Sequence, residues 1–155
     1  MGFANVASML ILLIAALSIT TGVVLSLKDY YDKTTSAVTL EQTRLSEQLK
    51  TDITIEVVDF DNLTNTTYAY VKNSGAQRLD VAKVDIYLDD VRIPRNETNR
   101  TIAVIPDTEV LNNETWDTKE VALITVFNFT LASNVIHEVS VTTQYGVKDT
   151  LEFSI

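Results

Sequence analysis

The sequence predicts a long N-terminal α-helix, transmembrane in its first half and a stalk in its second, followed by an all-β sandwich. Three observations lead to this fold class: an uncharged apolar start, a helical spacing of apolar residues that continues beyond it, and alternation of apolar and polar residues after Lys50. Helices repeat every 3.6 residues or so and strands about every two, so the change of period marks a change of structure. We therefore expect two parts, a transmembrane and stalk helix over residues 1–50 and a β-sandwich domain over residues 51–155.

The apolar start is long enough to cross a membrane. Residues 1–27 carry no charge, and residues 9–27 are apolar apart from a few Ser, Thr and Gly. A spanning helix needs about 20 such residues. A secretory signal peptide has a cationic start, an apolar core of roughly 7 to 15 residues and a small-residue cleavage site, and none of these is present. We expect a single-pass anchor.

The helical pattern continues past the apolar stretch, because no Pro or Gly occurs over residues 25–74. Apolar residues at helical spacing predict one narrow membrane or assembly face, which consists of Met9, Leu13, Leu17, Val24, Leu27, Tyr31, Val38, Leu45 and Leu49. Two interpretations stay open. The helix is a plain anchor whose stripe packs on its own β-domain, or the stripe packs on copies of itself or on a filament.

The second part of the chain reads as about eight short strands separated by polar turns, which is typical of a sandwich. In the first strand, Ile53, Ile55 and Val57 are expected on one face. Turns are expected at residues 73–75, 89–90 and 145–146. The strands are expected within residues 51–60, 68–72, 81–88, 91–93, 101–105, 121–128, 137–143 and 150–155.

The β-domain carries all of the net charge. The chain has 12 basic and 21 acidic residues, a net charge of −9, and residues 1–50 are balanced. An acidic surface repels phosphate backbones and anionic headgroups, which argues against nucleic-acid binding. No cysteine occurs, so disulfides and thiolate chemistry are excluded.

Sequons for N-glycosylation are the most informative local signal, since six occur among ten asparagines. All six lie beyond residue 60, and Asn128, expected at a strand end, is the least suited to a glycan. They predict that the β-domain is extracytoplasmic and the N-terminus inside. The alternative is chance in a Thr-rich β sequence. The six are Asn62, Asn65, Asn96, Asn99, Asn113 and Asn128.

No residue pattern indicates catalysis, a cofactor or a metal. His137 is the single histidine and has no neighbouring nucleophile or second ligand, so it is interpreted as a surface or packing residue. The pairs Asp59 with Asp61 and Asp89 with Asp90 lack the spaced ligands of a calcium loop and are interpreted as solvated turns. We expect no enzyme activity and no cofactor.

Four segments carry a family resemblance: the opening MGFANVASMLILLIAALSITTGVVLSL, the polar helix that follows it, the block YVKNSGAQRLDVAKVDIYLDDVRI over residues 70–93, and the closing VSVTTQYGVKDTLEFSI. Together they resemble archaeal flagellar protein F, an archaellum accessory or stator protein within the wider archaellin and type IV pilin-like group. The strand, Asn-Ser-Gly turn, strand pattern is also similar to archaellins and flagellar protein G. Asn73 and Gly75 are the residues that carry over, as a fold-forming turn.

The resemblance implies a membrane-anchored immunoglobulin-like sandwich that projects under the S-layer, binds S-layer protein, and forms homo-oligomers or joins a filament-like assembly. The leading hypothesis is therefore a stator role in motility, with other archaellum components as further partners. The alternative is an archaellin or pilin-type filament subunit assembled through the N-terminal helix, although such proteins carry a short basic leader that is not seen before Met1. A third class is a tethered enzyme or sugar-binding module that uses Trp116, which is otherwise interpreted as covering one edge of the core.

Overall fold

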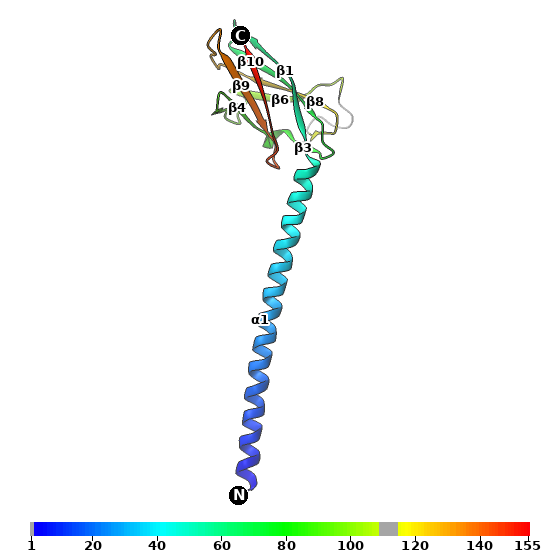
Figure 1. Cartoon of the computed structure of the whole chain (residues 1–155), viewed down its shortest axis with the longest axis vertical. Helices are drawn as coiled ribbons and strands as arrows, with labels where there is room; N and C mark the ends of the chain where they lie inside the picture. Colours follow the sequence, from blue (N-terminus) through cyan, green and yellow to red (C-terminus); the bar gives the residue numbers. More distant parts are fainter. Residues whose placement is uncertain (1, 109–114) are drawn as a thin grey trace. The chain divides into compact units, whose positions relative to one another are not determined.

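The computed structural model describes residues 2–108 and 115–155. Within them, helix α1 (Gly2–Lys50) is followed by ten strands and one short 3-10 helix (Figure 1). The chain forms two compact units, Met1–Thr43 and Arg44–Ile155. A long helix followed by a β-sandwich is thus confirmed. The predicted boundary at residue 50 stays a prediction, because the last turns of α1 group with the strands.

Helix α1 contains no proline, and several of its Ser and Thr hydroxyls donate to a backbone carbonyl of the same helix. Ser18, Thr20 and Thr21, in the apolar half, each donate to the carbonyl four residues earlier at 2.8 Å. Such bonds keep polar groups paired where no water is present. The helix ends at Lys50, and the amide of the next residue, Thr51, donates to the Gln48 carbonyl at 3.1 Å.

Two four-stranded antiparallel sheets make the sandwich, and a two-stranded sheet adjoins them. The first sheet has the order β1-β2-β8-β6, the second β10-β9-β4-β5, and the third pairs β3 with β7. The strands are β1 (Ile53–Asp61), β2 (Thr66–Asn73), β3 (Leu79–Asp80), β4 (Asp85–Leu88), β5 (Val91–Arg92), β6 (Arg100–Val104), β7 (Thr115–Trp116), β8 (Val121–Val126), β9 (Ile136–Thr142) and β10 (Lys148–Ser154).

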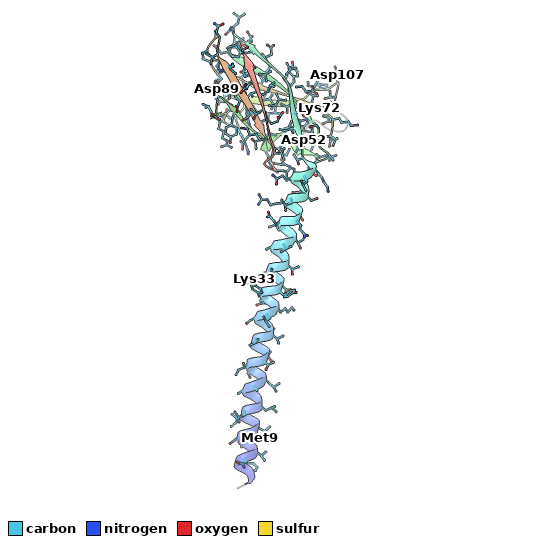
Figure 2. All side chains as sticks on the ribbon, viewed as in Figure 1. Met9, Lys33, Asp52, Lys72, Asp89 and Asp107 are labelled. Atoms are coloured by element: carbon cyan, nitrogen blue, oxygen red, sulfur yellow. The ribbon has the colours of Figure 1, made fainter. Side chains whose placement is uncertain are left out.

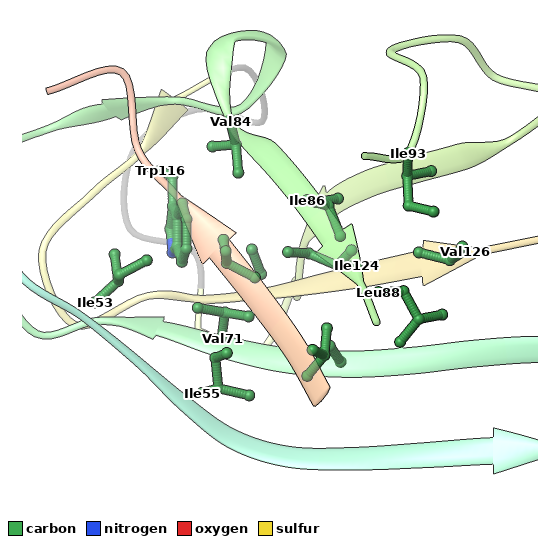
Figure 3. Packing of buried hydrophobic residues seen from close by; sticks show 14 of the residues in the cluster. Ile53, Ile55, Val71, Val84, Ile86, Leu88, Ile93, Trp116, Ile124 and Val126 are labelled. Carbon is green, nitrogen blue, oxygen red and sulfur yellow. The ribbon is translucent and has the colours of Figure 1, made fainter. Parts of the chain in front are cut away.

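The inner faces of both large sheets meet in one hydrophobic core (Figure 3). Val71 and Ile124 come from the first sheet and Ile86 and Val141 from the second, and all four have no exposed surface. Trp116 of the small sheet is also fully buried, and its indole Nε1 donates to the Glu120 carbonyl at 2.9 Å. Trp116 therefore covers the core, which agrees with its interpretation as a packing residue and not as an exposed sugar-binding contact.

The expected alternation of β1 is wrong after Ile55. The pairing with β2 shifts between Ile55 and Val57, which is a β-bulge. Because one extra residue enters the strand, Val57 is 53% exposed, whereas Val58 packs against the core. The Asp149 carboxylate of β10 accepts the Ile55 amide at 2.7 Å beside the bulge, and so ties the two sheets together.

Two expected strands are shorter in the structure. The single strand expected over residues 81–88 is wrong, because the 3-10 helix η1 (Val81–Lys83) precedes β4. The Asp80 side chain caps η1 by accepting the Ala82 amide, which stops the chain from remaining extended. Strand β8 ends at Val126, so Asn128 lies beyond the strand and not at its end.

The turn after β2 holds the C-terminal end of α1. Gly75 donates its amide to the Asp52 carbonyl at 2.9 Å, and the next two amides donate to the Lys50 carbonyl at 2.7 and 3.1 Å. Asn73 is fully buried, and its Nδ2 donates to the carbonyls of Gln77 and Trp116 at 2.9 and 3.0 Å. These contacts explain why an Asn and a Gly occupy this turn.

Candidate assembly surfaces

The predicted helix face is entirely exposed. Its nine residues lie within about 80° of the helix circumference at about 100° per residue. Leu45 and Leu49, which belong to the same unit as the strands, are 49% and 86% exposed. The stripe therefore does not pack on the β-domain there, and that interpretation is wrong for these two residues. The side chains of Met9 and Lys33 project freely from α1 (Figure 2).

Helix α1 is long and apolar enough to cross a membrane. Its most apolar window, within Asn5–Lys50, has a mean hydropathy of 2.5 and is not buried in the molecule. An exposed apolar surface of this length is stable only in lipid or against protein.

The outer face of the first sheet carries an apolar row that crosses all four strands. Val57, Tyr70, Leu123 and Ala103 are cross-strand partners in the order β1-β2-β8-β6. Val57 is 53% exposed, Tyr70 and Leu123 are half-buried, and Ala103 is exposed. We call these four residues the apolar row. The amino-acid sequence alone does not reveal this row, because strand register and the bulge in β1 decide which side chains align.

The outer face of the second sheet is charged and polar. Arg92 and Arg95 both bind the Asp85 carboxylate, at 2.7 and 2.9 Å. Tyr87 stands beside this cluster as the cross-strand partner of Arg92. The two faces of the sandwich therefore offer different chemistry to a partner.

The sequons gather at one end of the sandwich, opposite the strand end where α1 joins β1. The Phe127 amide donates to the Asn99 carbonyl at 2.8 Å, and the Phe129 amide donates to the Asn65 carbonyl at 3.2 Å. The loops that contain Asn62, Asn65, Asn96, Asn99 and Asn128 therefore adjoin one another, and Asn113 lies outside the described residues.

Turn geometry offers a second reason for some of these asparagines. Asn65 and Asn128 have φ of 49° and 55°, a left-handed conformation that Asn tolerates well. The Asn96 side-chain oxygen accepts the Asn99 amide at 2.9 Å. Glycan attachment at any of the six sites stays a prediction.

His137 is buried, with 5% exposure, and both of its ring nitrogens are engaged. Nε2 lies 2.8 Å from the Ala132 carbonyl and Nδ1 lies 2.7 Å from the Asp89 carboxylate. Both partners are acceptors, so the doubly protonated ring suits the site best. These contacts raise the pKa of His137 above its ordinary value, the Ala132 carbonyl contributing most. This is a packing role, as the sequence indicated.

The acidic pairs take part in turns. Asp61 accepts the Leu63 amide and the Thr64 hydroxyl, each at 2.8 Å, and these bonds lower the pKa of Asp61. Asp89 and Asp90 both have positive φ in the two-residue turn between β4 and β5. Among residues 2–108 and 115–155, no group of three or more His, Asp or Glu side chains is placed to hold a metal ion.

Comparison with known structures relates this fold to the archaellum. The archaellum periplasmic stator protein FlaG from Sulfolobus acidocaldarius matches over 66% of this chain and 99% of its own, with 15% identity and a TM-score of 0.52. A chain of the archaeal flagellum of Methanospirillum hungatei matches over 100% of this chain and 94% of its own, with 11% identity and a TM-score of 0.58. At these identities the likeness shows the fold alone.

Sequence comparison gives the family. Curated protein sequences give no match. The family model described as archaeal-type flagellin matches residues 2–153, nearly the whole chain. The apolar helix and the sandwich thus occur together in one family, and this chain belongs to the archaeal-type flagellin family.

Proposed function

We propose that this chain is a non-enzymatic archaellum accessory protein that anchors the motility motor to the cell envelope by binding S-layer protein. One observation carries the proposal: the sandwich reproduces the fold of the stator protein FlaG over 99% of that chain. Family membership supports a place in the archaellum. Other archaellum components, the membrane and further copies of the chain are its remaining partners.

The proposed location is the cell membrane, with α1 as a single-pass anchor and the β-domain outside. The exposed apolar surface of α1 supports the anchor. The clustering of five sequons in adjoining loops supports the outside location, because glycans need an open surface. The immunoglobulin-like character of the sandwich is part of the same proposal. It is supported by the strand orders, which equal the A-B-E-D and G-F-C-C′ orders of immunoglobulin domains.

The apolar row is the proposed contact for S-layer protein. A partner that must resist torque needs many contacts over a broad surface, and a row across four strands provides them. Tyr70 lies near its centre, where aromatic side chains contribute most to affinity. Glu56 and Lys72 flank the row with one charge of each sign, paired at 3.7 Å.

Binding of purified S-layer protein to the full chain in lipid nanodiscs tests the proposal. We expect Tyr70→Ser to weaken binding about tenfold or more, as a central aromatic contact would. Tyr87→Ser is the matched control, since Tyr87 is half-buried on the outer face of the other sheet, and we expect it to bind like the parent. Absence of binding by the parent chain at both neutral and acidic pH would refute the stator role.

The second candidate is a filament subunit assembled through α1. It is favoured by the match to a flagellum chain over the whole of this chain, helix included. Mass spectrometry of the native N-terminus separates the two functions, because archaellins lose a leader during processing. Sedimentation of the native protein with filaments would support the second candidate, and recovery in the membrane fraction with Met1 intact would support the first.

A further inference from the structure

The β-domain has a pocket of about 610 Å³ beside the open edge of the sandwich. The 3-10 helix η1 forms one wall with Val81, and β6 and the segment after β8 form the others with Ile102 and Phe127. Arg95, Glu97 and Arg100 add charged groups to the lining. The volume falls in the range of small-molecule sites, roughly 300 to 1,000 Å³. None of the residues that line the pocket belongs to the apolar row.

Arg100 is the unusual residue of this pocket, because it is only 6% exposed yet has no carboxylate partner among the described residues. Its Nη2 donates to the Val84 carbonyl at 2.6 Å. Its Nη1 is buried and has no hydrogen-bond partner within the described chain. Burying a cation without a counter-charge costs free energy, because the charge loses its hydration. A residue that only closed the edge of the sandwich would not need to be charged.

Neighbouring charges do not neutralise Arg100. The nearby carboxylate of Asp85 is already bound by Arg92 and Arg95, so three guanidinium groups share it. Burial of the guanidinium, followed by repulsion from Arg95, lowers the pKa of Arg100. In a chain of net charge −9, this is a local concentration of positive charge that favours an anion.

We propose that this pocket binds a small organic carboxylate, with Arg100 supplying the counter-charge. A carboxylate is a single negative charge, and it balances the one guanidinium of the pocket lining that has no carboxylate partner among the described residues. A phosphate dianion needs more free donors than remain, because Arg95 uses its Nε and Nη2 on Asp85 and the Lys83 carbonyl. Val81, Ile102 and Phe127 suit the carbon body of the ligand. Glu97 opposes binding through its like charge and keeps the affinity modest.

Titration of the full chain in neutral detergent micelles with butyrate tests this assignment. Amide shifts of Val81, Ala82 and Ile102, followed by NMR, are expected to change and saturate with a dissociation constant in the millimolar range. Butyramide has the same shape without the charge and is expected to cause no saturable change. Sulfate is the second probe, and binding equal to that of butyrate would overturn the carboxylate assignment.

Matched substitutions test whether the charge of Arg100 is the one that binds butyrate. Arg100→Met is expected to abolish the butyrate response, whereas Arg92→Met, which removes a charge from the same cluster but not from the pocket lining, is expected to preserve it. Should Arg100→Met fail to fold, Ala82→Phe fills the pocket without touching a charge and is expected to abolish the response, and Glu97→Gln is expected to tighten binding at least threefold. Equal loss in both arginine variants, or an unchanged response in Ala82→Phe, would overturn the proposal.

Discussion

Because Gly75 packs closely against the end of α1, we expect Gly75→Ala to lower the free energy of unfolding substantially. A Cβ at this position would lie 2.4 Å from the Asp52 amide nitrogen and 2.6 Å from the Lys50 carbonyl oxygen, where ordinary contacts begin at 3.4 Å. Both atoms belong to the backbone and cannot rotate away. The turn and the end of the helix must therefore separate by about 1 Å, the difference between 3.4 and 2.4 Å.

The cost follows from the bonds that such a shift breaks. Three backbone hydrogen bonds join residues 75–77 to Lys50 and Asp52. Each bond contributes about 0.5–1.5 kcal/mol, so the loss of all three lowers the free energy of unfolding by about 1.5–4.5 kcal/mol. That loss is a large share of the stability of a small domain, about 5–15 kcal/mol.

Urea unfolding of the full chain in micelles measures this loss through the fluorescence of Trp116, the one tryptophan of the sequence. Gly146→Ala is the matched control, because Gly146 has φ of +80° but open space around it. Only the left-handed conformation opposes that change, at a cost of about 1 kcal/mol. A Gly75→Ala variant no less stable than Gly146→Ala would refute the reasoning from close approach.

Two further predictions concern side chains of the second sheet, His137 of β9 and Asp149 of β10. Because contact with a carbonyl and with Asp89 raises the pKa of His137, its stabilisation is fully present below about pH 6.5 and is lost as pH rises through the raised pKa. The unfolding midpoint should therefore fall over that range in the parent and fall less in His137→Gln, and parallel curves would exclude the assigned charge state. Asp149→Ala removes the acceptor for the amide in the β1 bulge, 2.7 Å away, and should lower the unfolding free energy by about 1–2 kcal/mol. Glu152→Ala on the exposed side of β10 should change it by less than about 0.5 kcal/mol, and equal effects of the two would contradict the bonding role.

The helix and most strands could be predicted from the sequence because their signals are local. An uncharged apolar run and a helical spacing need no partner to be recognised, and α1 does end at Lys50 as expected. The bulge in β1 could not be predicted, since it depends on pairing between Ile55 and Val71 and not on a local signal. The two-residue strands β3 and β7 lay below the length at which alternation is visible.

The candidate surfaces depend on contacts between distant residues. His137 meets Asp89 across 48 positions of sequence, and no spacing rule connects them. The sequons were recognisable one by one, but their gathering at one end requires the strand order. The unpaired Nη1 of Arg100 has no sequence signal at all, because Arg100 looks like an ordinary polar residue at the start of a strand.

The long ladder between β1 and β2 has a mechanical consequence. The backbone runs from Thr51 directly into β1, whose register with β2 extends from Ile53 opposite Asn73 to Asp61 opposite Thr66. Ladder hydrogen bonds lie across the strands, so a pull between Thr51 and the far end of the sandwich loads them in shear, all at once, and not one after another. The ladder then breaks only as fast as the domain unfolds under force, and loading all of its hydrogen bonds together makes that unfolding slow. A β-domain connected in this way transmits tension along its strands without unzipping.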